Sequence, residues 1–429
     1  MKLNKRYSRS ISNNLSFYIS ATVLTIMTLF LFFIMNIAGE AIWQFGDDFF
    51  ASQNLEDANF TTYLPIPEED INKLEEEYSI NLEPQYYSNI ETDGTTARVF
   101  KKTSEINLYS VTEGRDMKQN DEIIISEGYA VFNKISLGDH ITIGNKNYTV
   151  TGFFQRPDYL YMLQNEGDSY KNVTTFYLAY VTDEAFENIG NENCLYLVRY
   201  NKNNQSEFRK EINEKYYMRT YISAKENMRI DMVKMQAEMF TAISYIILAI
   251  MPLVVVVLVS IVINRKVKSE QKLIGTLAAL GYKKSKLMLH YAGFAMIPGL
   301  FGGILAVFFA IIFAQPFGEI CLADYEPMRI KCHLNPIAAL LGIIVPTIMY
   351  VFAAMRSVHK LLKKDTVLLL NGNSEQGEKN YKNILVKSKL SFRVKYALRS
   401  LIGNPSRTFV VSLGVFLGSY HVHNGKYGR

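Results

Sequence analysis

The chain is poor in the residues and motifs that carry enzymatic chemistry. Its 429 residues include three cysteines, six histidines and one tryptophan. The motifs H-E-x-x-H, C-x-x-C and G-x-S-x-G are absent, and residues 372–377, which have the first spacing of a nucleotide-binding loop, are followed by Glu378 instead of a Lys-Ser/Thr pair. His421 and His423 are too few ligands for a zinc site. We therefore expect no catalytic site, no metal site and no cofactor in this chain.

The cysteines are also too few for a disulfide framework. Cys194, Cys321 and Cys332 form an odd set, in which the last two are near enough in sequence to close a loop. A Cys321–Cys332 bridge and free thiols remain alternatives. A fold that depends on disulfides is not expected.

Charge is missing from four long stretches, residues 15–37, 240–263, 287–318 and 336–355. About 20 apolar residues, at about 1.5 Å per residue, cross the hydrocarbon core of a bilayer. The stretches predict four membrane-spanning helices, because helices buried in a soluble core rarely run so far without a charge. The first is too long for the apolar part of a signal peptide, so we interpret it as an uncleaved anchor.

Basic and acidic residues are distributed unevenly around these stretches. Residues 1–14 hold four basic residues and no acidic residue. Residues 264–286 hold seven basic residues and one acidic residue, and residues 356–407 hold twelve basic residues and three acidic residues. Residues 38–93, in contrast, hold fourteen acids and one base. The positive-inside rule places the basic segments in the cytosol and residues 38–239 and 318–335 outside the cell membrane. The net charge of +5 results from this uneven distribution of basic and acidic residues. We therefore do not expect nucleic acid as a partner.

The segment between the first two stretches is long enough for one or two compact domains and mixes helical and strand-like patterns. Pro67, followed by three acidic residues, is typical of a helix N-terminus, and Gly144-Asn145 is typical of a turn between strands. We expect an α+β domain, with strands at 105–111, 122–126, 140–143, 148–151, 176–181 and 195–200 and helices at 67–78, 127–133, 183–188 and 206–215.

Four methionines precede the second stretch at helical spacing: Met228, Met232, Met235 and Met239. They predict one face of a helix continuous with that span. The helix is either a stalk that carries motion from the membrane to the outer domain, or an amphipathic helix packed on its own domain.

The basic segment between the second and third spans has the pattern of an amphipathic helix. Leu273, Ile274, Leu277 and Leu280 share one side, which can seat in a groove of a partner protein. Gly281 is expected to end the helix as a C-cap glycine, and lysines follow it. The alternative is an ordinary interfacial helix that lies on lipid.

The third span contains Pro298, Gly299 and Gly303. The two glycines form a small-x-x-x-small surface that allows close helix approach, and the Pro-Gly pair favours a kink. Bundle packing and a flexible gate are the two interpretations.

The segment from Glu270 to Tyr282, preceded by a basic run after a span, resembles the coupling motif of the FtsX-like permease family of ABC transporters. The matching positions are Glu270, Ile274, Leu277, Ala279 and Gly281. Residues 122–154 resemble the MacB-like outer domain of that family, through residues 123–126, Ala130, the turn at 137–139 and residues 148–152. The resemblance covers most of residues 1–370.

This resemblance implies a coupling helix that docks on a separate cytosolic ATPase dimer, which binds the ATP. The coupling residues are then Glu270, Leu273, Ile274, Leu277, Ala279, Leu280 and Gly281. It further implies contact with membrane lipids and pairing with a second permease copy or a homologous permease. Larger family members carry a second half, so we expect that half to be truncated here, with a partial fifth span.

We therefore expect a non-enzymatic permease subunit that exports or extracts a lipid, lipoprotein or peptide, or alternatively a membrane module that senses peptide antibiotics without moving cargo. The expected architecture is an α-helical membrane bundle with an α+β domain between spans 1 and 2. Its segments are a cytosolic N-terminus (1–14), span 1 (15–37), the outer domain (38–239, stalk 224–239), span 2 (240–263), the coupling helix (264–286), span 3 (287–317), an outer loop (318–335), span 4 (336–355), a cytosolic linker (356–407), a partial span 5 (408–420) and a tail (421–429).

Overall fold

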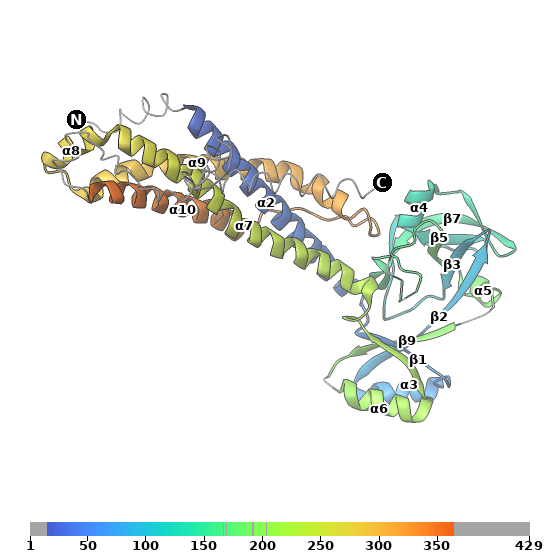
Figure 1. Ribbon diagram of the computed structural model, residues 1–429. Helices are drawn as coiled ribbons and strands as arrows, with labels where there is room; N and C mark the ends of the chain where they lie inside the picture. The colour runs from blue at the N-terminus through green and yellow to red at the C-terminus, as the bar shows by residue number, and fades with distance from the viewer. Residues whose placement is uncertain (1–14, 166, 169, 191–192, 203, 364–429) are drawn as a thin grey trace, which may run out of the picture. The chain divides into compact units, whose positions relative to one another are not determined.

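The computed structural model describes residues 15–363, apart from residues 166, 169, 191–192 and 203. Four of its helices are long and apolar enough to cross a membrane (Figure 1). They are α2 (Leu15–Ser52), α7 (Met228–Ser269), α9 (Lys284–Cys321) and α10 (Pro336–Leu362). A region rich in β-structure lies between the first and second of them in sequence, as predicted. The expected partial fifth span, the cytosolic linker beyond residue 363, the tail and residues 1–14 lie outside the described residues.

The helices extend beyond the predicted spans. Helix α2 continues to Ser52, and α7 begins at Met228 and includes the expected stalk, the second span and the first residues of the basic segment. The charge-free stretches mark the part of a helix that matches a bilayer, whereas the backbone hydrogen bonds continue wherever polar residues are compatible with helix. Hydropathy therefore located the spans and underestimated the helices.

The contacts within the chain divide it into two compact units. We call the first the helical unit; its described residues are 15–33, 244–310 and 335–363. The second, the sheet unit, comprises residues 34–243 and 311–334. Helices α2, α7 and α9 each contribute residues to both units.

Glycines let the helices of the helical unit approach closely. A Cβ atom at Gly299 of α9 would lie 2.6 Å from Oγ1 of Thr347 in α10, and one at Gly303 would lie 3.0 Å from Cγ1 of Ile343. Gly302, on another side of α9, faces Thr25 of α2 in the same way. Around these contacts, aliphatic and aromatic side chains of α2, α7, α9 and α10 form one core, which includes Tyr18, Val255, Val259, Ile263, Tyr291, Phe294, Tyr350 and Ala354.

The sheet unit is built on a mixed sheet of ten strands among the described residues. The order is β10-β1-β9-β2-β3-β8-β5-β7-β4, and β6 pairs with β7. The pairs β3–β8 and β5–β7 are parallel, and the remaining pairs are antiparallel. The strands are β1 (Ala58–Thr62), β2 (Ile80–Thr92), β3 (Thr95–Phe100), β4 (Ser110–Gly114), β5 (Glu122–Ser126), β6 (His140–Ile143), β7 (Lys146–Gln155), β8 (Phe176–Tyr180), β9 (Asn193–Tyr200) and β10 (Met218–Ser223).

Short helices cover the two parts of this sheet. Helices α3 (Glu68–Tyr78) and α6 (Gln205–Tyr216) enclose a core with β1, β2 and β9, and α4 (Glu127–Asn133) and α5 (Asp183–Glu187) enclose a second core with β3, β5, β7 and β8. A short 3-10 helix, η1 (Pro157–Tyr159), follows β7. This arrangement confirms the α+β expectation.

One predicted strand is wrong, and strands β1 and β10 and the hairpin of β2 and β3 were missed. The segment 105–111 enters a strand only at Ser110, because the N–H groups of Asn107 and Leu108 donate to the carbonyls of Asn54 and Gln53 instead of a sheet partner. The long hairpin of β2 and β3 turns at Asp93 and Gly94, which have φ angles of 51° and 76°. An Asp-Gly pair is a hairpin signal, so this element was open to prediction from sequence.

Candidate functional site

The predicted coupling segment folds as a helical elbow. Helix α7 ends at Ser269, α8 (Gln271–Ala279) follows after one residue, and α9 begins at Lys284. The N–H of Gly281 donates to the carbonyl of Ala278, and the N–H of Tyr282 donates to that of Leu277. These two bonds and the φ of +83° at Gly281 form a Schellman motif. The predicted role of Gly281 as the stop of this helix is confirmed.

The apolar side of α8 is divided between the chain's own core and solvent. Ile274 is completely buried in the core of the helical unit, and Leu277 packs against that core. Leu273 is half-buried, whereas Ala279 is exposed and Leu280 is 71% exposed. Ile274 thus holds α8 on the bundle and is not available to a partner, while the surface at Ala279, Leu280 and Gly281 is available.

Glu270 lies at the corner between α7 and α8 and faces inward. Its Oε2 accepts a hydrogen bond of 2.5 Å from the hydroxyl of Tyr291 in α9, and its Oε1 lies 3.4 Å from Nζ of Lys266 in α7. The Lys266 ammonium in turn lies 4.3 Å from the centre of the Phe294 ring. One carboxylate therefore connects α7 with α9 around α8, which makes Glu270 a positioning residue of the elbow.

The third-span residues lie where helices pack. Gly299 and Gly303 face α10, as described above, and α9 continues as helix through Pro298. These contacts match the interpretation as bundle packing. The gate interpretation remains a prediction.

In the sheet unit, the ends of α2 and α7 are bonded to loop segments of the same unit. The carbonyl of Asn54, just after α2, accepts from the N–H of Asn107 at 3.0 Å. At the start of α7, Nε and Nη2 of Arg229 donate to the carbonyls of Leu163 and Gln164 at 2.9 and 3.0 Å. These hydrogen bonds connect the end of α2 with residue 107 and the start of α7 with residues 163 and 164, within one compact unit.

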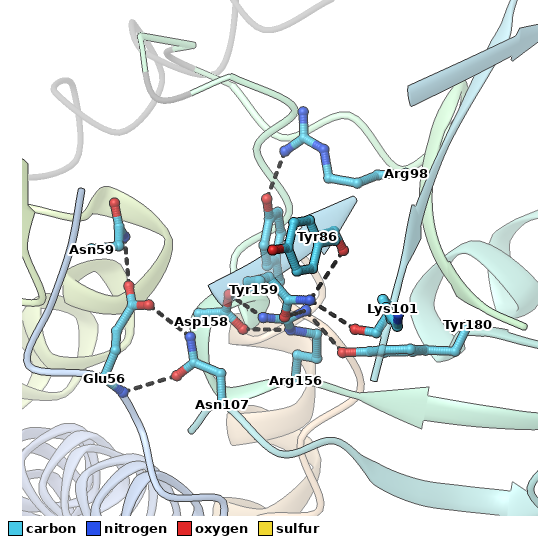
Figure 2. Close-up of polar contacts among 11 residues, drawn as sticks. Glu56, Asn59, Tyr86, Arg98, Lys101, Asn107, Arg156, Asp158, Tyr159 and Tyr180 are labelled. Atoms are coloured by element: carbon cyan, nitrogen blue, oxygen red, sulfur yellow. Dashed lines mark hydrogen bonds and ion pairs between the residues drawn. The ribbon is translucent and has the colours of Figure 1, made fainter. Parts of the chain in front are cut away.

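A buried polar network lies beside the first of these attachments (Figure 2). Glu56 and Asn107 exchange hydrogen bonds: the Glu56 N–H donates to Oδ1 of Asn107 at 2.9 Å, and Nδ2 of Asn107 donates to Oε2 of Glu56 at 2.7 Å. Burial, and next the charge of Asp158, raise the pKa of Glu56 to about 7. Hydrogen-bond donors therefore satisfy the carboxyl group of Glu56, but its ionised form is disfavoured.

Arg156 forms the centre of the same network. Its Nε and Nη2 donate to the two oxygens of Asp158 at 2.8 and 2.9 Å, and its Nη1 donates to the hydroxyl of Tyr180 at 2.8 Å. The guanidinium lies 4.1 Å from the centre of the Phe100 ring. A fully paired buried arginine fixes geometry, since removing either partner would leave a buried charge alone. We interpret this network as a rigid support for the attachment of α2.

A third attachment, which the sequence did not indicate, is the loop between α9 and α10. The Glu326 side chain accepts a hydrogen bond of 2.7 Å from the N–H of Gly128. The backbone N–H of Glu326 donates to the carbonyl of Leu160 at 2.9 Å. Arg329 donates from Nη2 and Nη1 to the two oxygens of Glu127 at 2.7 and 3.1 Å. The predicted short loop, residues 322–335, is thus held against α4 and the segment after β7, and we call it the clamp loop. Partners about 200 residues apart leave no local pattern, so no sequence signal revealed it.

Burial dominates the electrostatics of this clamp. Glu326 is 3% exposed, and one of its oxygens, Oε1, has no hydrogen-bond partner among the described residues. Burial raises the pKa of Glu326 to about 8, and the neighbouring charge of Glu127 acts in the same direction. The protonated carboxyl is therefore the favoured form at neutral pH.

The methionine face of α7 does not pack on the sheet unit as a stripe. Met228, Met235 and Met239 are exposed, and Met232 alone contacts the core formed with residues such as Ile230, Val233 and Ala237. The predicted spacing is correct, but the alternative in which this face packs on its own domain is wrong for those three residues. Cys194, Cys321 and Cys332 form no disulfide, so the suggested Cys321–Cys332 bridge is not formed.

Comparison with known families agrees with this architecture. The family model for the FtsX-like permease C-terminal domain matches residues 243–366, which include the membrane part of α7, the elbow, α9 and α10. No curated protein sequence matches the chain. Members of this family are permease-type membrane components of ABC transporters. Residues 243–366 are therefore similar to the FtsX-like permease C-terminal domain, in a chain with the helices of a multi-pass membrane protein.

Proposed function

We propose that this chain is the permease subunit of an ABC transporter, and that a dimeric cytosolic ATPase docks on the elbow around α8. The family normally works with such an ATPase. The observation that carries the proposal is the exposed apolar surface at Leu280, directly before the Schellman turn, on a helix whose other side is buried through Ile274. A rigidly held helix with an exposed leucine is suited to transmit force from a partner.

The elbow links the two helices that enter and leave it. Glu270 contacts Tyr291 of α9 and Lys266 of α7, so displacement of α8 would move both helices. Helix α7 is continuous from Ser269 back to Met228, where Arg229 is bonded to the backbone of residues 163 and 164. We infer that nucleotide-driven movement travels along α7 to the sheet unit, which lies outside the cell membrane and has the role of a MacB-like domain.

The cargo in this proposal is a lipid, lipoprotein or peptide that the sheet unit engages on the outer side. The ATP stays in the partner, so this chain uses no cofactor of its own, and a second permease copy or a homologous permease completes the assembly. The alternative is a sensor for peptide antibiotics. A transporter predicts ATP hydrolysis stimulated by cargo, whereas a sensor predicts partner-dependent signalling without movement of cargo.

Docking is tested by substitutions on the two sides of α8. Leu280→Asp should abolish co-purification of the co-expressed ATPase from detergent extracts, without a change in the melting temperature of the permease. Ile274→Ala should lower the free energy of unfolding by about 2–5 kcal/mol, the cost of a buried cavity, and should therefore lower the melting temperature. The exposed Lys210→Gln on α6 is the control. Full retention of the ATPase by Leu280→Asp would contradict docking at this surface.

A further inference from the structure

The strongest unassigned feature of the sheet unit is a cavity of about 900 Å³ beside the clamp loop. This volume lies within the range of about 300–1,000 Å³ that is usual for small-molecule sites. Its walls come from α4, from residues 171–174, from the last two turns of α9 and from the loop that follows α9. All of these residues belong to the sheet unit, so one compact body holds the whole cavity.

Apolar side chains line most of this cavity. Val131 and Phe132 of α4 are 65% and 56% exposed, although both are large apolar residues. Met328 and Ile330 of the clamp loop line the cavity with them. Exposed apolar surface that lines a cavity is suited to bind an apolar group, and these walls fit a hydrocarbon chain.

Three cationic side chains line the cavity: Lys171, which pairs with Asp324, and Arg329 and Lys331. Arg329 and Lys331 line both this cavity and a neighbouring one of about 400 Å³, to which His333 contributes. Arg329 is paired with Glu127, but Lys331 is exposed and forms no ion pair within the described residues. Glu127, Glu319 and Asp48 are the carboxylates that line the two cavities, and Glu127 already pairs with Arg329, so the charge balance suits one phosphodiester and not a polyanion.

The place of the cavity along the chain identifies the source of such a molecule. Gln315 and Glu319 line it from the last two turns of α9, a helix long and apolar enough to span a membrane. The other lining residues of this segment, 322–331, end just before the next membrane helix begins at Pro336. A segment that joins two spanning helices leaves the bilayer and returns to it, so part of it passes the level of the lipid headgroups.

We propose that this cavity binds one phospholipid of the membrane, with its phosphate between Lys331 and Arg329 and an acyl chain along Val131, Phe132 and Met328. The proposal does not depend on an ATPase, because the site belongs entirely to the described part of this chain. A bound lipid would join α4, the end of α9 and the clamp loop.

The test uses the full chain in a Trp43→Phe/Phe132→Trp variant, in which the single tryptophan stands in the cavity. In nanodiscs of phosphatidylcholine, addition of phosphatidylglycerol with brominated acyl chains should quench its fluorescence. Lys331→Glu in this variant should weaken quenching about tenfold in apparent affinity, as expected for one lost charge-assisted contact. Lys210→Glu on α6, a surface charge change away from the cavity, should leave the quenching unchanged.

Other outcomes would overturn the proposal. Quenching that Lys331→Glu does not alter would show contact with bulk lipid only. A fluorescence change with inorganic phosphate or with an amphipathic peptide, without quenching by the brominated lipid, would assign the cavity to those ligands instead. Native mass spectrometry of the unmodified chain gives an independent readout: the wild type should retain a phosphatidylglycerol that Lys331→Glu loses, and equal retention by both would count against the site.

Discussion

The carboxyl group of Glu326 accepts a hydrogen bond of 2.7 Å from the backbone N–H of Gly128, a residue 198 positions earlier in the chain. This bond joins the loop after α9 to the start of α4. The oxygen that does not accept it is buried without a partner among the described residues. The contact therefore holds two distant segments together in a form that depends on protonation.

Glu326 should make stability depend on pH in the neutral range. Its pKa is raised from 4.5 to about 8 in the folded state, mainly by burial. The folded protein then keeps a proton that the unfolded chain releases, so this contribution to stability is complete below about pH 4.5 and is lost as the pH rises to 8. Glu326→Gln should remove this dependence and be more stable than wild type at pH 8–9 by a few kcal/mol.

The measurement is the melting temperature of the full chain in detergent between pH 5 and 9. Glu56 adds a slope of the same sign, because burial raises its pKa to about 7, so the difference between wild type and Glu326→Gln isolates Glu326. Glu69→Gln, an exposed position on α3, is the control. Parallel curves for wild type and Glu326→Gln would contradict the assignment.

Gly128 should tolerate no side chain. A Cβ atom there would lie 2.5 Å from Oε1 of Glu326, which is buried and has little room to move. Gly128→Ala should therefore destabilise the sheet unit by about 1–3 kcal/mol. Gly167→Ala, where no atom lies within 4 Å of the added carbon, should have no such effect in the same thermal melts. Equal behaviour of the two variants would show that the clamp is loose.

Gly281 should be replaceable by asparagine but not by alanine. Its φ of +83° lies in the left-handed region, which costs a residue with a Cβ atom about 1–2 kcal/mol. Gly281→Ala should lower the melting temperature and weaken ATPase co-purification, because the Schellman turn fixes the exposed end of α8. Asparagine tolerates this conformation better, so Gly281→Asn should recover most of both properties. If Gly281→Ala and Gly281→Asn behaved alike, the Schellman turn would not be needed for docking of the ATPase.

Glu270 and Tyr291 should be energetically coupled. Their hydrogen bond connects the corner before α8 with α9, so the single variants Glu270→Gln and Tyr291→Phe should not be additive in a double-mutant cycle. We expect a coupling of about 1–2 kcal/mol in chemical or thermal unfolding. The same cycle with Tyr282→Phe in place of Tyr291→Phe is the control, and a coupling near zero for Tyr291 would remove Glu270 from its role in the elbow.

Much of the helical unit and part of the sheet unit could be predicted from sequence. Strand β5, strand β6 and helix α4 have the expected bounds, since a buried aliphatic run or a short amphipathic turn is a local pattern. The hairpin of β2 and β3 was missed although Asp93-Gly94 signals it, because β2 mixes polar residues with Pro84. The strand expected at 105–111 failed because its backbone bonds to the end of α2.

The candidate site divides in the same way. The amphipathic pattern of residues 273–280 located α8, but it gave Ile274 and Leu280 the same role, and only packing shows that one is buried and the other exposed. The family resemblance assigned Glu270 to the contact with a partner, whereas its neighbours in space are Lys266 and Tyr291.

By itself, the sequence determined the four spans, the α+β character of the intervening region and the glycine stop of the elbow. These depend on hydropathy and on backbone preferences within a few residues, which are local properties. The tertiary structure alone decided which side of α8 is exposed, how the ends of α2 and α7 are held, and that Glu326 connects the loop after α9 with Gly128. Those features depend on pairs of groups far apart in the chain. Their partners, charge states and exposure are set only when folding brings these groups together and buries them.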